Sequence, residues 1–191
     1  MAEQTTLIEP FGVDIDLESG VLENPSNRTV RRASDMRGYY EDEEALEQLI
    51  REYDDPLHYE VEEKPVPSEY GHLMYCISRL QPGTVGGECF MTKGHFHTIE
   101  NTAETYLCLR GSGYMVMKTK DGAFRAEPMW RGRMVYVPPY WAHRSVNTGD
   151  DVLVSHCVYP ADAGHNYGDI KEQGFLKRVM KDLNGHVEIR D

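Results

Sequence analysis

The sequence Lys93-Gly94-His95-Phe96-His97 carries the pattern that decides the fold of this chain. Two histidines separated by one residue lie on the same side of a β-strand, because successive side chains of a strand alternate between its two faces. They can therefore share one metal ion. Glu104 on the next strand and His143 further along would complete a shell of three nitrogens and one oxygen, which suits a first-row divalent metal. The pattern predicts a mononuclear metal site inside a small β-barrel.

Short strands separated by turn residues are predicted from about Tyr70 onward. Their apolar segments end at Gly, Pro, Asn or Asp, which favour turns, and Asp121-Gly122 is the strongest hairpin signal. Regularly spaced short strands are typical of a β-sandwich or barrel. The predicted strands are 73–80, 87–93, 105–109, 114–119, 123–130, 135–138 and 152–158, with one more hairpin around 183–186.

One strand and one helix are predicted before the barrel. Residues 11–17 alternate apolar and polar side chains, which predicts an amphipathic strand that either pairs within its own barrel or extends across a partner subunit. Asp42 is expected to cap a helix that ends at Asp54-Asp55-Pro56. The apolar residues that recur at helical spacing within it are Leu46, Leu49, Ile50 and Tyr53.

Charge and apolar runs narrow the class of protein. Acidic residues outnumber basic ones by 32 to 20 in the 191 residues, so the formal net charge is −12, which disfavours nucleic acid and anionic membranes as partners. An anionic substrate would then need a locally positive pocket, and Lys93 and Arg144 beside the candidate ligands could supply the charge. Neither a signal peptide nor an apolar run of membrane-spanning length is recognisable, which indicates a cytoplasmic protein.

The cysteines also favour a reducing compartment. They form no Cys-x-x-Cys pair and no dense framework, which predicts reduced thiols rather than disulfides. Cys108 is an alternative thiol ligand for the metal. The four residues are Cys76, Cys89, Cys108 and Cys157.

The wider pattern resembles the two motifs of the cupin superfamily. Six residues separate His97 from Glu104, where cupins usually have three or four, and Tyr140 stands where many cupins have Gly. Both departures restrict the resemblance to one group within the superfamily. The strings TKGHFH, AETYLCLRGSG, YVPPYWAHRSVNTG and YPADAGHNYG are similar to those of the cupin-type phosphoglucose isomerases, also called glucose-6-phosphate isomerases. FGVDIDLESG and VRRASDMRGYY near the start extend the resemblance over most of the chain. The motif positions are His95, His97, Glu104, Gly111, Gly132, Pro138, His143 and Asn147.

The resemblance implies an all-β cupin jelly-roll β-barrel with a few short peripheral helices and an N-terminal strand arm. Within a single domain, residues 1–69 would form the arm and a short helix, and 70–160 the barrel core with both metal motifs. Residues 161–191 would form a substrate loop and a C-terminal hairpin. The resemblance also implies a cytoplasmic homodimer that interconverts glucose 6-phosphate and fructose 6-phosphate in glycolysis and gluconeogenesis.

One divalent metal ion per subunit is implied, with Fe²⁺ expected first and Mn²⁺, Ni²⁺ or Zn²⁺ as alternatives. Glu104 is the candidate base that moves a proton through a cis-enediol. The alternative is a hydride shift in which Glu104 moves only hydroxyl protons. His156 and His186 fall outside the motifs and are expected to have ordinary structural roles. Carried over from the family, the metal ligands are His95, His97, Glu104 and His143.

Several polar residues match substrate contacts of the same family. Tyr106 shares a strand face with Glu104, so it either contacts the sugar or packs the barrel interior. His165 would assist ring opening and Tyr167 would bind phosphate. Strict alternation would place Thr92 and His95 on opposite faces, and a bulge or kink at Gly94 would bring them together. The positions that match the family's phosphate contacts are Ser78, Thr92, Gly94, Tyr159 and Tyr167, and Tyr59 matches a sugar contact. The full set of matching substrate positions is Tyr59, Ser78, Thr92, Gly94, Tyr106, Tyr159, His165 and Tyr167.

Two other functions fit the same metal shell. Three histidines and one glutamate also suit an iron-dependent cupin dioxygenase. A cupin that binds a sugar phosphate without converting it is the third reading. The hydroxyl-rich cluster of Tyr159, His165 and Tyr167 favours a phosphorylated polyol over the apolar substrate of an oxygenase.

Overall fold

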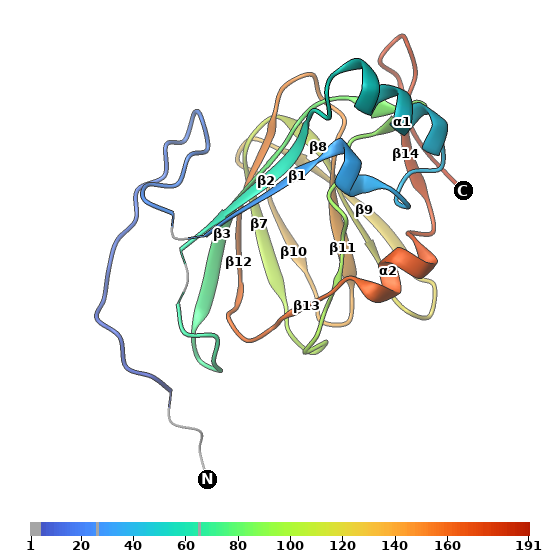
Figure 1. The fold of residues 1–191 in the computed structure, drawn as a ribbon. Coiled ribbons are helices and arrows are strands. Elements are labelled where there is room, and N and C mark those ends of the chain that lie inside the picture. Colours follow the sequence, from blue (N-terminus) through green and yellow to red (C-terminus); the bar gives the residue numbers. More distant parts are fainter. Residues whose placement is uncertain (1–4, 26, 65) are drawn as a thin grey trace.

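Strands dominate the computed structural model, which describes residues 5–25, 27–64 and 66–191 (Figure 1). The larger sheet has six strands, and all the neighbouring pairs in it are antiparallel. In spatial order they are β1 (Asn27–Arg32), β2 (Leu57–Glu63), β3 (Leu73–Leu80), β12 (Leu153–Pro160), β7 (Glu104–Arg110) and β10 (Met134–Val137).

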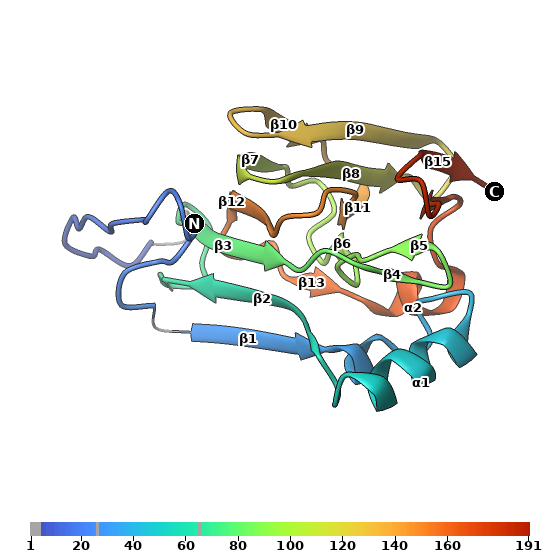
Figure 2. The same cartoon turned by 90° about the horizontal axis from the view of Figure 1, so that it is seen from above.

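A second layer packs against this sheet (Figure 2). Its strands are β11 (Ala142–Asn147), β8 (Ser112–Lys118) and β9 (Phe124–Trp130), in that order. Single β-bridges from Met91 to Val146 and from His95 to His143 join the segment before β6 (Phe96–His97) to β11. β6 in turn pairs with β13 (His165–Asn166). The all-β class and the jelly-roll arrangement predicted from the sequence are confirmed.

A hydrophobic core packs between the layers. Cys108 of β7 and Leu80 of β3 pack in the same buried cluster as Met115 of β8 and Met129 of β9. Burial of such side chains contributes roughly 1.5–3 kcal/mol each relative to an exposed position. Apolar burial therefore holds the two layers together around the interior where the metal motifs lie.

A small four-stranded sheet lies beside the layers. β14 and β15 form the hairpin predicted around residues 183–186, and that prediction is confirmed. The strands in spatial order are β15 (Val187–Arg190), β14 (Arg178–Lys181), β5 (Glu88–Cys89) and β4 (Thr84–Val85).

The helices are few and short, as predicted, and they lie at the periphery of the sheets (Figure 2). They are the 3₁₀-helix η1 (Ala33–Met36), α1 (Glu43–Glu52) and α2 (Gly168–Gln173). Asp42 caps α1, because its side chain accepts a hydrogen bond of 2.8 Å from the Ala45 N–H. Leu46 is fully buried beneath the helix. Across the described part of the chain, no helix is long and apolar enough to cross a membrane.

The predicted strand at residues 11–17 is wrong. Only Ile15 forms a single bridge, to Leu22. The Asp16 carboxylate accepts hydrogen bonds from the backbone N–H groups of Glu18 and Ser19, and this local turn competes with strand pairing. The first regular strand is β1, which begins at Asn27. The structure also contains β1, β2 and β11, none of which the sequence pattern had singled out, and it replaces the predicted strand 87–93 with the short β5 and an irregular segment.

An ion-pair network occupies the outer face of β1, β2 and β3. Arg79 lies 2.9 Å from Glu60 and 2.7 Å from Glu62, and all three side chains are buried. Arg28 pairs with Glu60 from β1. The N-terminal segment covers this network, because Arg79 donates to the Gly20 carbonyl and Glu62 accepts from the Leu22 N–H. The opposite face of the same strands is left for the interior.

Candidate metal centre and its pocket

A cavity of about 420 Å³ lies between the two layers. Because strand side chains alternate, the residues of the larger sheet that line it are two positions apart on each strand. They are Thr29 and Arg31; Tyr59, Val61 and Glu63; Cys76 and Ser78; Glu104 and Tyr106; Cys157 and Tyr159. The opposite wall consists of Thr92, Lys93, Gly94, His95, Ser145, His165 and Tyr167.

Four side chains at this cavity could hold one metal ion. One ligand atom from each of His95, His97, Glu104 and His143 can be chosen so that all four lie within 4.8 Å of one another. β6 and β7 carry His97 and Glu104, whose Nε2 and Oε2 atoms are 3.1 Å apart. The reciprocal backbone bonds between His95 and His143, at 3.2 and 3.0 Å, bring the first imidazole beside the last.

The hydrogen bonds behind these imidazoles fit a cation. His143 Nδ1 lies 3.3 Å from the Trp141 carbonyl, which can only accept, so the proton belongs on Nδ1. His97 Nδ1 lies 2.8 Å from the Thr102 hydroxyl, whose own proton is donated to the Ile99 carbonyl. Both Nε2 atoms then present lone pairs toward the Glu104 carboxylate. Acceptors that face one another need a cation between them, so this donor set suits a divalent metal.

His95 supports the same reading. Its Nε2 atom is buried and has no hydrogen-bond partner among the described residues. Burial and then the nearby imidazoles of His143 and His165 hold the pKa of His95 well below its usual value, which keeps the ring neutral. A neutral, desolvated imidazole nitrogen without a partner is a ready metal ligand.

Glu104 is the negative charge of the group. Burial by itself raises the pKa of this carboxyl, but positive charge at the facing imidazole nitrogens of His143 and His97, which a bound cation would equally supply, outweighs burial and holds the pKa well below the ordinary value. Glu104 is therefore an ionised carboxylate inside the protein. It faces Tyr106 on the same strand, whose pKa burial raises well above its usual value, so that phenol keeps its proton as a donor.

Gly94 resolves how Thr92 and His95 reach the same cavity. Its φ is +74°, in the left-handed region that favours glycine, and it lies outside any strand. A Cβ at this position would lie 2.7 Å from the Phe175 ring and 3.0 Å from the His143 carbonyl. The turn in the backbone re-aims the chain after Thr92, so both side chains line the pocket.

His165 and Tyr167 lie over the metal group. The His165 ring is 4.3 Å from the His95 ring, centroid to centroid, and Tyr167 stacks on His165 at 5.9 Å. The pairing of β13 with β6 sets His165 directly opposite His97. Burial lowers the pKa of His165, which favours the neutral imidazole in the pocket. The sequence-predicted substrate residues therefore all line one cavity.

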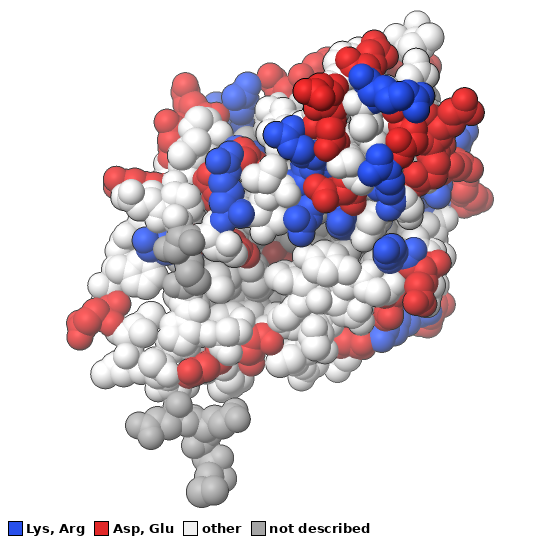
Figure 3. All heavy atoms as spheres, viewed as in Figure 1, with Lys and Arg blue, Asp and Glu red and all other residues white. Residues whose placement is uncertain are grey.

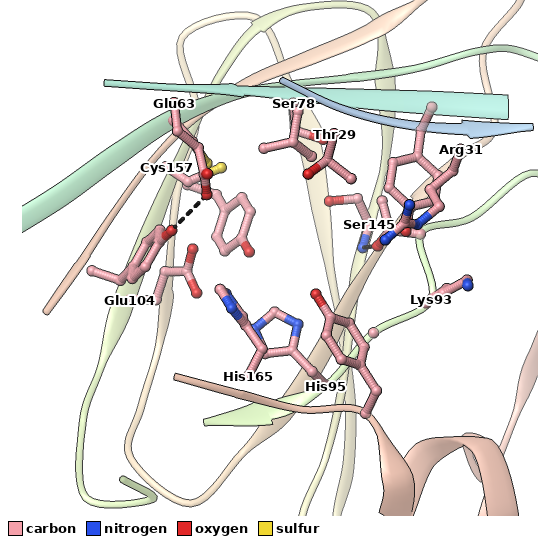
Figure 4. Close-up of a pocket in the computed structure, with 18 of the residues that line it drawn as sticks. Thr29, Arg31, Glu63, Ser78, Lys93, His95, Glu104, Ser145, Cys157 and His165 are labelled. Atoms are coloured by element: carbon pink, nitrogen blue, oxygen red, sulfur yellow. Dashed lines mark hydrogen bonds between the residues drawn. The ribbon is translucent and has the colours of Figure 1, made fainter. Parts of the chain in front are cut away.

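The two ends of the cavity differ in charge (Figure 4). Glu63 lies at one end and accepts a hydrogen bond of 3.1 Å from the Tyr159 hydroxyl. Arg31 and Lys93 lie at the other end. Burial and then the Arg31 charge lower the pKa of Lys93, which reflects how the two cations share that end.

The cavity is also lined by Arg31, Glu63 and Thr29, which the sequence pattern does not single out. They belong to β1 and β2, which carry no metal motif, and only the registered pairing of these strands with β3 turns their side chains inward. The string VRRASDM, which contains Arg31, was part of the family resemblance and was the available signal.

Arg144 does not supply charge to the pocket, contrary to the sequence prediction. It follows His143 on β11, so alternation turns it to the other face. Its guanidinium is buried, donates to the Lys93 carbonyl at 2.8 Å and lies 4.2 Å from the centre of the Phe175 ring. Arg144 therefore supports the backbone behind the pocket.

Three other residues lie away from the metal group. Cys108 is buried in the core with its thiol directed to the Arg110 carbonyl, so it is not placed as a ligand. His156 lies against Tyr75, and His186 is exposed. All four cysteines are free and buried.

Comparison with known proteins gives consistent matches over nearly the whole chain. A model of the glucose-6-phosphate isomerase family matches residues 30–190. The glucose-6-phosphate isomerase of Thermococcus gammatolerans is 52% identical over 95% of this chain and 94% of its own. That of Pyrococcus horikoshii is 49% identical over 96% and 95%. A solved structure of Bacillus subtilis oxalate decarboxylase aligns with a TM-score of 0.45 and 23% identity, over 56% of this chain and 27% of that chain.

Proposed function

The chain belongs to the glucose-6-phosphate isomerase family, and from this we propose that it interconverts D-glucose 6-phosphate and D-fructose 6-phosphate. The observation that carries the proposal is the combination of sites in one cavity. A group of three imidazoles and one carboxylate lies beside hydroxyls and two cations that suit a sugar phosphate. The class of reaction is an intramolecular aldose–ketose isomerisation.

We propose that His95, His97, Glu104 and His143 hold one divalent ion. Fe²⁺ is the first choice, and Mn²⁺, Ni²⁺ and Zn²⁺ suit the same three-nitrogen, one-oxygen donor set. When bound, such an ion supplies Lewis acidity that polarises the sugar carbonyl and orients the neighbouring hydroxyl. Thr102 and the Trp141 carbonyl keep the imidazole rings in the required tautomer and orientation.

Isomerisation moves hydrogen between C1 and C2 of the open-chain sugar, so a base must reach a carbon-bound hydrogen. Glu104 is the candidate, since it is ionised and lines the cavity. A carboxylate that is fixed by several partners is a weaker base than a free one, so one oxygen must turn toward the substrate during the reaction. We propose that the neutral His165 ring moves a hydroxyl proton in ring opening and that Tyr106, which keeps its proton, donates a hydrogen bond to a sugar oxygen.

Two routes for the hydrogen give different isotope patterns. In the cis-enediol route Glu104 takes the proton from one carbon and returns it to the other, with exchange against solvent. In the hydride route the hydrogen moves with its electron pair directly between the carbons, and Glu104 moves only hydroxyl protons. We expect the enediol route, so the reaction in deuterated water should place deuterium at C1 or C2 of the product. Complete absence of carbon-bound deuterium would support the hydride route instead.

The remaining substrate contacts follow from the cavity lining. We propose that Tyr59, Ser78, Thr92, Gly94 and Tyr167 contact the substrate toward its phosphate. Tyr159 already donates to Glu63, so we assign its phenol to the sugar end. Hydroxyl and backbone N–H donors of this kind satisfy phosphate oxygens without requiring many formal charges.

A coupled assay tests the function directly. Purified protein, loaded in turn with each of the four metals, is given fructose 6-phosphate, and formation of glucose 6-phosphate is followed before and after chelation. We expect turnover that chelation abolishes and metal restores. Oxygen consumption without isomerisation would instead identify a cupin dioxygenase. Sugar phosphate binding without turnover in metal-replete protein would identify a non-catalytic binding protein.

We also propose a homodimer that works in the cytoplasm, in glycolysis and gluconeogenesis. The N-terminal segment supports a partner subunit, because it runs beyond the sheets in Figure 1 and exposes Leu7, Phe11 and Leu17. Apolar side chains of this size are commonly covered when a subunit interface forms. The free, buried cysteines agree with a reducing compartment.

A further inference from the structure

Arg31 and Lys93 reach one end of the cavity from different layers (Figure 4). Arg31 belongs to β1, where its Cα lies opposite that of Tyr59 on β2. Lys93 belongs to the irregular segment before β6 and lies with its Nζ 5.3 Å from the centre of the Tyr39 ring. Two cations therefore face the same space between the sheets.

Neither cation forms an ion pair with a carboxylate within residues 5–25, 27–64 and 66–191, although the Asp35 charge acts on Lys93 from a longer distance. The Arg31 Nε atom is buried without any hydrogen-bond partner there, and Nη1 has only a contact of 3.3 Å with the Val30 carbonyl. Arg31 and Lys93 are both partly buried, and like charges that share such a space repel each other unless an anion lies between them. The unused donors of Arg31 point to an anionic ligand.

The side chains of the two other arginines of β1 are held differently from that of Arg31. Arg28 points to the outer face and forms ion pairs with Glu60 and Glu62. Arg32 is exposed and donates to the Asp55 carbonyl at 2.8 Å. Both have partners on other elements of the fold, whereas, among the described residues, Arg31 donates only to the carbonyl of the residue before it. A purely structural role therefore does not account for Arg31.

The surroundings of the two cations suit a phosphate dianion. Side-chain hydroxyls and phenols of Thr29, Ser78, Thr92, Tyr39, Tyr59 and Tyr167 line the same cavity. A guanidinium presents parallel N–H donors that match two phosphate oxygens, and such charge-assisted bonds are stronger than neutral ones. The surface around the pocket does not provide a general anion attraction, because acidic and basic side chains are mixed on that face (Figure 3).

The opposite end of the cavity is acidic. Glu63 accepts hydrogen bonds from Asn27 at 2.7 Å and from Tyr159 at 3.1 Å, but no cation among the described residues neutralises it. Glu63 and Glu104 lie on the side of the cavity away from Arg31 (Figure 4). A second phosphate at this end would meet an unneutralised carboxylate.

From this separation of charge we propose that Arg31, with Lys93 beside it, is the principal determinant of phosphate binding, and that Glu63 excludes a second phosphate from the other end. The pocket thus selects a sugar with one anionic end and orients it with its reacting carbons toward Glu104. This inference rests on the proposed isomerase function for the identity of the sugar. The anion site itself depends only on the charges and contacts of the cavity.

The first experiment measures phosphate binding with and without Arg31. Metal-loaded wild type, Arg31→Gln, Arg31→Lys and the same-strand control Arg32→Gln are titrated by calorimetry with inorganic phosphate and with fructose 6-phosphate. We expect Arg31→Gln to weaken both by about tenfold or more, Arg31→Lys to restore part of the affinity, and Arg32→Gln to match wild type. Equal binding by wild type and Arg31→Gln, or no binding by wild type, would overturn the proposal.

Kinetics on the same proteins separates this proposal from the proposed function. Arg31→Gln should raise KM for fructose 6-phosphate by about tenfold while changing kcat by less than about threefold. If wild type binds phosphate through Arg31 but does not isomerise the sugar, the anion site stands and the isomerase function fails. If wild type isomerises and Arg31→Gln has unchanged KM, the function stands and the role of Arg31 is refuted.

The second experiment tests the acidic end. Glu63→Gln removes the charge and keeps an amide that can hydrogen-bond to Asn27 and Tyr159. We expect it to bind inorganic phosphate as wild type does but to bind fructose 1,6-bisphosphate about tenfold more tightly than wild type. Unchanged affinity for the bisphosphate would refute the role of Glu63 in exclusion.

Discussion

His143 Nε2 lies 2.9 Å from Glu104 Oε2, although the two residues are 39 positions apart in the sequence. Both belong to strands that face the interior, one in each layer. Because the Nδ1 proton of His143 is donated to the Trp141 carbonyl, its Nε2 atom is an acceptor that faces another acceptor, the Glu104 carboxylate oxygen. The relationship therefore marks the cation site most directly.

Replacing His143 with Ala should remove one metal ligand and leave Glu104 without its nearest partner. We expect metal affinity to fall by more than about 100-fold, with a parallel loss of turnover. Metal content after dialysis, measured by mass spectrometry, checks this result. The exposed His186→Ala is the matched control, and full metal occupancy in His143→Ala would refute the assignment.

Thr102 should act on the metal through His97. Its hydroxyl accepts from His97 Nδ1 at 2.8 Å, so Thr102→Val removes the partner that fixes the ring while keeping the side-chain shape. We expect metal affinity to fall by about tenfold and the folded structure to remain. Competition against a calibrated chelator measures the change. An affinity equal to that of wild type would mean that the ring is held by other contacts.

Glu104→Gln separates binding from chemistry. The amide cannot serve as a base, so we expect turnover to fall by about 10²–10⁴-fold or more. Affinity for fructose 6-phosphate should change little, because the proposed phosphate contacts are elsewhere in the cavity. Single-turnover rates, calorimetry and metal content on the same sample test this. Substantial turnover in metal-loaded Glu104→Gln would exclude Glu104 as the essential base.

His58 predicts a loss of stability in mild acid. The ring is buried between Tyr40, which shares a hydrogen bond of 2.9 Å with its Nε2, and Phe90. Burial lowers the pKa of His58 to about 4 in the folded state. In the unfolded chain the pKa of His58 is about 6.5, so the unfolded state takes up the proton first as the pH falls. The stability that the neutral ring provides is therefore complete above that pH and is lost as the pH falls toward the pKa of the folded state.

Because of His58, we expect the free energy of unfolding to fall by about 2 kcal/mol when the pH is lowered from about 7.5 to about 5. Urea unfolding at the two pH values measures it in wild type and in His58→Gln, whose side chain can still pair with Tyr40. The variant should lose less stability than wild type over this range. The same pH dependence in both proteins would assign the loss to other groups, such as the carboxylates paired with Arg79.

Local patterns were sufficient to predict the metal group but not the whole pocket. His95, His97 and Glu104 depend on strand alternation and on motifs close together in the sequence, which a one-dimensional pattern retains. Alternation also excludes Arg144 from the face of His143, so that error was avoidable. The failed strand at residues 11–17 shows a local hydrogen bond from Asp16 prevailing over an apolar repeat.

Arg31 and Glu63 could not be placed in the same way. Their positions depend on how β1 and β2 are registered against β3, and pairing between distant segments is not written in either segment alone. The role of Gly94 could not be predicted from its own segment either, because its left-handed φ brings its backbone close to Phe175 and β11, which are distant in the sequence. The sequence predicted a bend there but not which wall it would complete.

β1 is an edge strand of the six-stranded sheet, whereas Glu104 lies on the inner strand β7 and the three histidines lie on β6, on β11 and in the segment before β6. An edge strand can change its side chains with less effect on the core than a central one. The proposed phosphate determinant Arg31 is thus on a different strand from the four residues of the metal group, although Lys93 stands two residues before His95. New specificities could arise in this scaffold by exchange of one peripheral strand, with the reactive centre kept intact.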